Sequence, residues 1–262
     1  MDKIAVTLLQ KPSVDPIKFI ASSTRLNFNI KDNFLYETDL NIHDKKDVNI
    51  ITNLIKAGHS PLEHCSYSIL ISNASRAFLA QVTRSRIGIS YSSQSQHYSN
   101  FVTGNFVVPI EIFEKCEELN STAPLQDFFN ICNFAHQVYQ DMQQKYDLKH
   151  DCTRAVTPQA MRNSLLITAN IRTWLNLIAL RICFRNTNEI RYITYKIREI
   201  LAQECPEIFK LSGPNCFCKG HCSEGKLTCK QPWKCFDDPE ENRWNNLQML
   251  GNKWREIYAQ NK

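Results

Sequence analysis

The sequence predicts a mixed α/β (α+β) fold, a single domain in which a sheet is flanked by long helices, followed by a cysteine-rich tail. Segments that alternate apolar and polar residues are interleaved with segments in which apolar residues recur at helical spacing. Of the 262 residues 43% are hydrophobic, enough for one substantial core, and no repeat or linker divides them. Composition shifts sharply near residue 213. We therefore expect a main domain over residues 1–212, and a tail with a C-terminal helix packed on it over residues 213–262.

The first half of the chain is expected to contain two strands and three helices. Asp15 and Pro16 form a helix start, because proline is tolerated at the first helical position. Gly58 marks a helix end, since glycine readily adopts the left-handed conformation of a C-cap. In order we expect a strand over Lys3–Leu9, helices over Asp15–Arg25 and Asp44–Ala57, a strand over Cys65–Ile71 and a helix over Ser75–Arg84.

The second half is expected to be mainly helical. An aromatic stripe at helical spacing makes Leu125–Tyr146 the longest predicted helix. In order we expect a short strand over Asn105–Ile110, this long helix, a strand over Ser164–Ile171, a buried helix over Thr173–Phe184 and an amphipathic helix over Asn188–Gln203.

Composition excludes several classes of protein. The net charge of +5 is modest and its charges are scattered, so we expect no nucleic-acid partner and a small anionic ligand instead. No apolar run is long enough to span a bilayer, and the first residues lack the features of a signal peptide, so we expect a cytoplasmic protein without a membrane partner. The first six cysteines are interpreted as reduced core residues: Cys65, Cys116, Cys132, Cys152, Cys183 and Cys205.

The segment from Gly58 to His64 carries two imidazoles, a hydroxyl and a carboxylate just after a predicted helix end. Histidine and glutamate are natural zinc ligands, but the spacing is not that of a helical HExxH site and Pro61 interrupts a regular helix. A purely structural turn is an alternative interpretation.

The segment TRSRIGISYSSQSQHYSN, from Thr83 to Asn100, combines fixed positive charge with many hydroxyl groups. Guanidinium and hydroxyl groups are good phosphate ligands. Gln81 and Arg84 are three residues apart and would share a face at the end of a predicted helix. The alternative is a solvated polar loop.

A third group places polar residues within the apolar segment Leu165–Phe184. Burying arginine without a partner is costly, so these side chains must face an acidic group, an anionic ligand or solvent. The group comprises Asn170, Arg172, Asn176 and Arg181, with Arg154 near a preceding predicted turn. GxGxxG and GxxxxGK[ST] are both absent, so any nucleotide must be held in a less common way.

Taken together, these three groups resemble the flavin-dependent thymidylate synthase family, in order from about Ala21 to Arg191. The Gly58 to His64 turn resembles the family's flavin-binding turn. Arg84-Ser85-Arg86 through Ser95 resembles the signature RHR-x7-S, with eight intervening residues rather than seven. The tail sequence GPNC...C...EGKLTC is similar to a tail of some bacterial members.

The resemblance implies the fold of this family, assembled as a homotetramer with active sites between subunits. It implies methylation of dUMP at C5 to dTMP, with methylenetetrahydrofolate as carbon donor, FAD as cofactor and NADPH as reductant. The residues implied for dUMP are Gln81, Arg84, Ser93, Ser95, Gln96, His97, Arg154 and Arg181. Arg181 would be catalytic, polarising the uracil ring so that C5 attacks the carbon donor without a protein nucleophile. Those implied for FAD are Ser60, Glu63, Arg84, Ser85, Arg86, Asn170, Arg172 and Asn176.

Three positions depart from the family pattern. Ser85 replaces a histidine, Ser93 aligns with an acidic residue and His97 aligns with an arginine. Because histidine is only partly protonated near neutrality, the His97 change weakens fixed phosphate charge. Two alternatives therefore stand beside the synthase: a C5-methylase or hydroxymethylase of another pyrimidine nucleotide, and a catalytically silent flavin- or nucleotide-binding protein.

The tail contains Cys216, Cys218, Cys222, Cys229 and Cys235 within twenty residues. Four thiolates can complete a tetrahedral zinc site, and the first four of these cysteines are the candidate ligands of a structural zinc. Free thiols or an iron–sulfur cluster are the alternatives.

Overall fold

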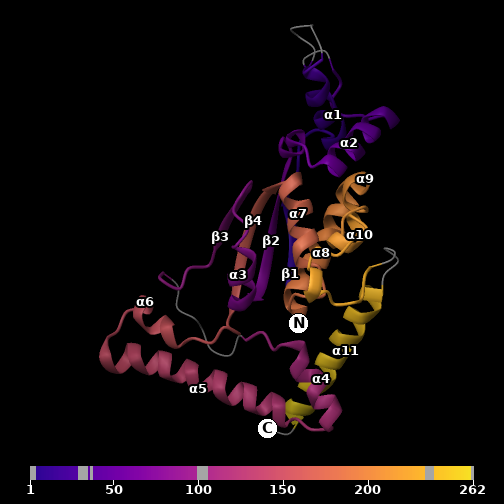
Figure 1. Cartoon of the computed structure of the whole chain (residues 1–262). Coiled ribbons are helices and arrows are strands. Elements are labelled where there is room, and N and C mark those ends of the chain that lie inside the picture. Colours follow the sequence, from indigo (N-terminus) through magenta and orange to yellow (C-terminus); the bar gives the residue numbers. More distant parts are fainter. Residues whose placement is uncertain (1–3, 29–34, 36–37, 99–105, 234–238, 261–262) are drawn as a thin grey trace.

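The structure is a computed structural model that describes residues 4–28, 35, 38–98, 106–233 and 239–260. An antiparallel sheet of order β1-β2-β4-β3 forms its centre, with helices packed on one face and at both ends (Figure 1). The strands are β1 (Ala5–Gln10), β2 (Ser66–Ser75), β3 (Ile89–Ser93) and β4 (Arg162–Asn170). The predicted mixed α/β fold is confirmed.

The helices described are α1 (Pro16–Leu26), α2 (Lys45–Ala57), α3 (Arg76–Val82), α4 (Ile110–Leu119), α5 (Ala123–Tyr146), α6 (His150–Thr153), α7 (Ile171–Arg181), α8 (Asn188–Glu204), α9 (Pro206–Phe209), α10 (Asn215–Cys218) and α11 (Pro239–Gln260). Short 3-10 turns are η1 (Ser60–Glu63), η2 (Arg154–Val156) and η3 (Gly225–Leu227). None of the helices within these ranges has the length and apolar character needed to cross a membrane.

Alternation along the two central strands defines the core. Tyr67, Ile69 and Ile71 of β2 are buried, as are Leu165 and Ile167 of β4, while the residues between them are only partly covered. Helices α7 and α8 lie against the buried face (Figure 1). Among the residues that the structure describes, the opposite face of the sheet is thus less covered.

Helix boundaries follow the expected caps. Asp15 accepts a hydrogen bond from the backbone of Lys18 at the start of α1, and Asp44 forms a capping box with Asp47 at the start of α2. Gly58 ends α2 in the left-handed conformation with φ of 66°.

Three predictions of local structure were wrong. The polar segment after Thr83 is not only a loop, because Ile89–Ser93 forms edge strand β3, which pairs with β4. The strand expected over Asn105–Ile110 is reduced to a single bridge at Phe106, and Ile110 begins α4; Asn105 lies outside the described residues. Helix α3 ends at Val82, so Arg84 lies beyond the helix instead of sharing a helical face with Gln81.

The C-terminal helix α11 packs on the main domain at the end of the molecule that holds α4 and α5 (Figure 1). Trp244, Leu247 and Trp254 are buried in the common core, and the Trp254 indole donates a hydrogen bond to Glu117 of α4 at 2.6 Å.

Candidate active site

The turn after α2 meets the start of α7. Glu63 of η1 accepts a hydrogen bond from Arg172 at 2.5 Å, and the backbone of Ile171 donates to the carbonyl oxygen of Cys65 at 3.0 Å. Ser60 opens the same 3-10 turn and is exposed. Three residues that the resemblance implied for the flavin are therefore brought to one place, two of them as an ion pair.

The segment after Arg86 lies directly on the start of α7. The backbone amide of Asn170 donates to the carbonyl oxygen of Gly88 at 3.2 Å, and the Thr173 hydroxyl donates to the carbonyl oxygen of Ile87 at 3.0 Å. The Asn170 side chain caps the helix by accepting from the Thr173 backbone at 2.9 Å. Asn170 thus has a structural role here in addition to the FAD-binding role that the family resemblance implies.

Tyr91 of β3 lies near Arg181 and Arg86, and Arg84 lies near Arg181. Burial raises the pKa of Tyr91 to about 12, and the charges of Arg181 and Arg86 act against this rise. Burial lowers the pKa of Arg181, Tyr91 opposes this change, and the nearby Arg84 adds to it. The Tyr91 hydroxyl is fixed at the signature segment, 2.8 Å from the carbonyl oxygen of Val82 and 3.0 Å from that of Ser85. We call Arg84, Arg86 and Arg181 the arginine cluster.

The arginine cluster lacks a carboxylate partner among the residues that the structure describes. In addition, the Nε atom of Arg181 is buried without a hydrogen-bond partner in that part of the chain. Cations at close range repel one another, and a buried donor without a partner is costly. An anion with acceptor atoms would relieve both costs.

A second group of predicted residues lies around η2. Gln96 is 5% exposed and its amide donates to the Thr157 hydroxyl at 3.1 Å. Burial lowers the pKa of Arg76, and Arg154 lowers it further, so these two arginines are neighbours. Ser95 accepts from the backbone of His97, whose ring nitrogen lies 3.9 Å from a carboxylate oxygen of Asp151.

The remaining predicted residues are more dispersed. Gln81 accepts a hydrogen bond from Thr187 at 3.4 Å, whereas Ser93 and Asn176 are exposed on β3 and α7. Across the described ranges no hydrogen bond or ion pair joins the arginine cluster to Arg154. One chain thus presents the predicted residues as separate groups.

Sequence reasoning missed Tyr91 and Arg76. Tyr91 alternates with Ile89 on β3, and this short alternation was the available signal, although serines surround it. Arg76 is the first residue of α3, and its proximity to Arg154 depends on the fold.

The cysteines differ in part from expectation. Cys65, Cys116, Cys132 and Cys205 are buried as predicted, but Cys152 is exposed and Cys183 is only partly buried. Of the proposed zinc ligands, Cys218 instead donates to the carbonyl oxygen of Gly213 at 3.2 Å. Within the described ranges no three side chains of His, Cys, Asp or Glu stand close enough to hold an ion as they are, and Cys235 lies outside those ranges.

Comparison with known proteins decides the family. The family described as thymidylate synthase complementing protein matches residues 8–207. The chain belongs to the flavin-dependent thymidylate synthase family. A flavin-dependent thymidylate synthase from Clostridium tetani is 29% identical over 227 residues, covering 82% of this chain and 89% of that protein. One from Geobacter sulfurreducens is 33% identical over 181 residues, covering 67% and 73% respectively.

A solved structure shares the fold of this flavin-dependent thymidylate synthase family member. The crystal structure of a UMP/dUMP methylase PolB from Streptomyces cacaoi, bound with 5-Br dUMP, superposes with a TM-score of 0.66. It is 17% identical and covers 79% of this chain and 94% of that one. Family membership makes the present chain an enzyme of the methyltransferase type.

Proposed function

We propose that this enzyme methylates dUMP at C5 to give dTMP, with methylenetetrahydrofolate as carbon donor and FAD, reduced by NADPH, as cofactor. The observation that carries the proposal is the arginine cluster at Tyr91, with the Arg181 Nε atom buried and unpaired among the described residues. Family membership gives the reaction class, and this cluster gives a place where an anionic nucleotide would be stabilised.

The face formed by η1, the signature segment and the start of α7 has donors suited to FAD. Ser60, Arg172 and Asn176 are exposed and offer a hydroxyl, a guanidinium and an amide. Arg86, Ser85 and the first turn of α7 complete a set of donors for phosphate and ring oxygens. When bound, FAD would supply the reducing equivalents for the reaction. Glu63 would orient Arg172 through their ion pair, and Asn170 would hold the helix start in place.

The nucleotide phosphate requires fixed charge, and Arg84 and Arg154 are the proposed ligands. Gln96 is linked to Arg154 through Thr157, and Gln96 with its chain neighbours Ser95 and His97 would contribute further hydrogen-bond donors. Arg76, a neighbour of Arg154, adds charge that compensates for His97 in place of an arginine. Gln81 and Ser93 are assigned to dUMP on the same proposal.

Arg181 is the proposed catalytic residue. Its guanidinium is partly buried at the end of α7, where low polarity strengthens its interaction with an anion. At the uracil edge it would stabilise negative charge developing on the N3 and O4 side of the ring, which raises the nucleophilicity of C5. No protein nucleophile is then needed.

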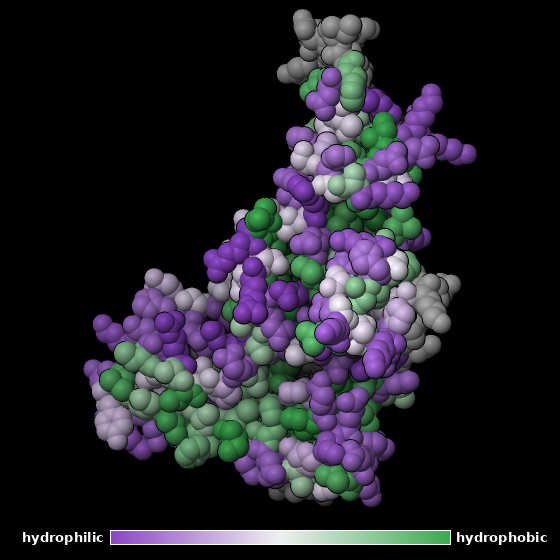
Figure 2. Space-filling model, in the orientation of Figure 1, coloured by the Kyte–Doolittle hydropathy of each residue, from purple (hydrophilic) through white to green (hydrophobic). Residues whose placement is uncertain are grey.

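A homotetramer would explain why the site groups stand apart in one chain. Helix α5 exposes Ile131 (68%) and Phe134 (69%), and Figure 2 shows a band of apolar surface over this helix. Figure 1 shows that α5 extends away from the sheet. We propose that this arm meets another copy and that residues of two or more chains complete each site. The cysteines within the described ranges are free, which fits our proposal of a reducing compartment such as the cytoplasm.

A second candidate is C5 modification of another pyrimidine nucleotide. It is favoured by Ser85, Ser93 and His97, which replace family residues at three site positions. The structural neighbour described as a UMP/dUMP methylase has this fold, so ribonucleotide substrates belong in the test.

Tritium release from C5-labelled nucleotides separates these candidates. We expect release from dUMP that requires both methylenetetrahydrofolate and NADPH, with dTMP as product. Release from UMP alone would favour the second candidate. Bound FAD without release from either nucleotide would identify a silent homologue.

A further inference from the structure

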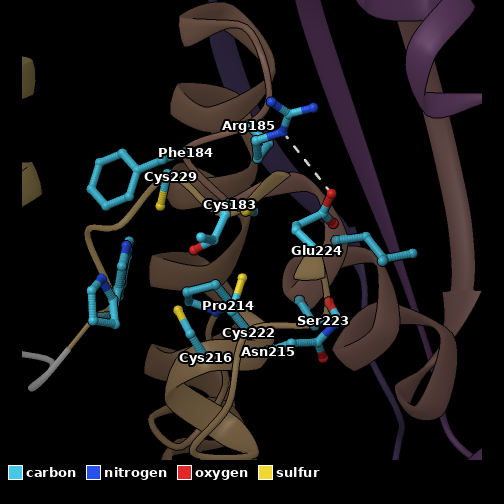
Figure 3. A pocket seen from close by; sticks show the side chains of 15 residues that line it. Cys183, Phe184, Arg185, Pro214, Asn215, Cys216, Cys222, Ser223, Glu224 and Cys229 are labelled. Atoms are coloured by element: carbon cyan, nitrogen blue, oxygen red, sulfur yellow. Dashed lines mark hydrogen bonds and ion pairs between the residues drawn. The ribbon is translucent and has the colours of Figure 1, made fainter. Parts of the chain in front are cut away.

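A cavity of about 40 Å³ lies between the end of α7 and the cysteine-rich tail. Four cysteines line it: Cys183, Cys216, Cys222 and Cys229. Figure 3 shows their side chains arranged around one space, with those of Cys216 and Cys222 on one side and that of Cys229 on the other. Three of these cysteines come from the tail, whereas Cys183 follows α7 in the main domain, two residues after Arg181.

Cys183 lies near other charged or ionisable groups of the cavity. Burial raises the pKa of the Cys183 thiol, and the neighbouring Cys229, Glu224 and Cys216 raise it further. Cys218 is not part of this arrangement, because it does not line the cavity and its thiol donates to the carbonyl oxygens of Leu211 and Gly213. The cavity therefore contains Cys183 in place of Cys218, which was one of the four cysteines that the sequence pattern suggested as zinc ligands.

Two of the sulfur atoms accept backbone hydrogen bonds of a kind that stabilises thiolate. The backbone N–H of Gln231 donates to the Cys229 sulfur at 3.4 Å, and a backbone hydrogen bond from Arg185 favours the charged form of Cys183. Each donor is two residues after its cysteine. Such hydrogen bonds to ligand sulfur tune thiolate–metal centres.

The walls of the cavity suit a negatively charged metal centre. Phe184 and Trp233 line it, and the centroids of their rings lie 6.3 Å apart. Arg185 also lines it and pairs with Glu224 at 4.0 Å, so that its charge is held at the cavity edge. Four thiolates around Zn²⁺, or around an iron–sulfur cluster, carry net negative charge that a nearby guanidinium would offset.

We propose that Cys183, Cys216, Cys222 and Cys229 ligate one thiolate-bound metal centre, a single Zn²⁺ or an iron–sulfur cluster, which joins the tail to the end of α7. The four cysteines line one cavity, but their side chains do not stand close enough to hold an ion as they are, so binding of the metal centre requires them to reorient. The centre has a structural role: it fixes the segment that follows the helix carrying Arg181. This proposal is independent of the substrate, since it concerns residues outside both site groups.

Metal content of the purified full-length chain tests the proposal. Protein produced and purified without oxygen should contain about one zinc, or an iron–sulfur cluster with acid-labile sulfide, per chain. Cys183→Ser should lower this content to less than about a fifth, whereas Cys218→Ser should leave it unchanged. X-ray absorption at the metal edge should show four sulfur neighbours, at about 2.3 Å for zinc.

The two variants discriminate between ligand sets. Loss of metal in Cys218→Ser with retention in Cys183→Ser would overturn the assignment in favour of a site within the tail alone. Wild-type protein that is metal-free after supply of zinc and of iron with sulfide would overturn the site itself. If Cys183→Ser does not fold, absorption spectroscopy of the wild-type protein still decides the number of sulfur ligands.

Discussion

Asn170 and Gly88 hold the signature segment on the start of α7. The backbone N–H of Asn170 donates to the Gly88 carbonyl oxygen at 3.2 Å, and a Cβ atom at Gly88 would lie 2.5 Å from the side-chain Nδ2 of Asn170. Gly88 also has φ of +69°, a conformation that other residues rarely adopt. This contact joins two parts of the chain that were assigned to the same cofactor from sequence.

Gly88→Ala should therefore destabilise the protein and weaken FAD binding. We expect the free energy of unfolding to fall by about 2 to 4 kcal/mol, from backbone strain together with displacement of Asn170 and Thr173. Gly220→Ala is the matched control, because Gly220 has φ of +70° but nothing within 4 Å of its added Cβ. Urea denaturation of both variants measures the difference, and equal losses would show that the close approach is unimportant.

Arg181→Ala should abolish turnover while FAD stays bound. We expect a loss of at least about 100-fold in kcat, because a cation aimed at developing charge is removed. Arg181→Lys keeps the charge without the Nε donor and should retain intermediate activity. Tritium release measures turnover and flavin absorbance measures occupancy. Near-normal turnover of the alanine variant would remove Arg181 from the mechanism.

Acid stability should depend on Asp47, which is fully buried and bonded to Arg25 and Lys18. Burial acts to raise its pKa, but hydrogen bonds from the Asp44 backbone, Arg25 and Lys18 outweigh this and lower it. Because the pKa of Asp47 is lower in the folded state, its carboxylate stabilises the fold at pH values above its pKa in the unfolded state, which is near 4. This stabilisation is lost as the pH falls through the pKa of Asp47 in the folded state.

Asp47→Asn should lower the free energy of unfolding by about 3 kcal/mol at neutral pH. It should also make the free energy of unfolding less dependent on pH in the acidic range. Glu118→Gln is the control, since Glu118 forms an exposed pair with Lys115 and should change stability by less than about 1 kcal/mol. Urea unfolding from neutral to acidic pH compares them. An unchanged dependence on pH in the acidic range in Asp47→Asn would contradict the assignment.

Charges on α5 should break the proposed assembly. Ile131→Asp and Phe134→Asp place a carboxylate on the exposed apolar surface, and desolvating it at an interface is costly. Met249→Asp is the control, because Met249 is 70% exposed but lies on a different helix, α11. Light scattering after size-exclusion chromatography should show smaller species for the α5 variants alone. A wild-type protein that is monomeric in this measurement would contradict the proposal that residues of two or more chains form each site.

Much of the fold was predictable because its core elements carry strong local patterns. Strands β2 and β4 alternate apolar residues, and α5 and α8 repeat them at helical spacing. Edge strand β3 was missed because serines occupy it and its pairing with β4 is a long-range interaction. Helix α4 was missed because the sequence before it ends in Pro109, which suggested the end of a strand.

The candidate site was predictable only in part. Residues within one segment, such as Glu63 or Arg86, were assigned to the candidate site from composition and family pattern, and that assignment stays a prediction. The role of Tyr91 and the neighbourhood of Arg76 and Arg154 depend on contacts between distant segments. Cys183 was assigned to the core for the same reason, because nothing near it in sequence links it to the tail.

The central claim is that the arginine cluster at Tyr91 binds the nucleotide beside the flavin. Titration of FAD-loaded protein with dUMP, followed through the absorbance of the bound flavin, tests it most directly. We predict a saturable spectral change whose apparent affinity falls at least about tenfold in Arg84→Ala. Protein that binds neither FAD nor dUMP, or an Arg84→Ala variant with unchanged affinity, would contradict the claim.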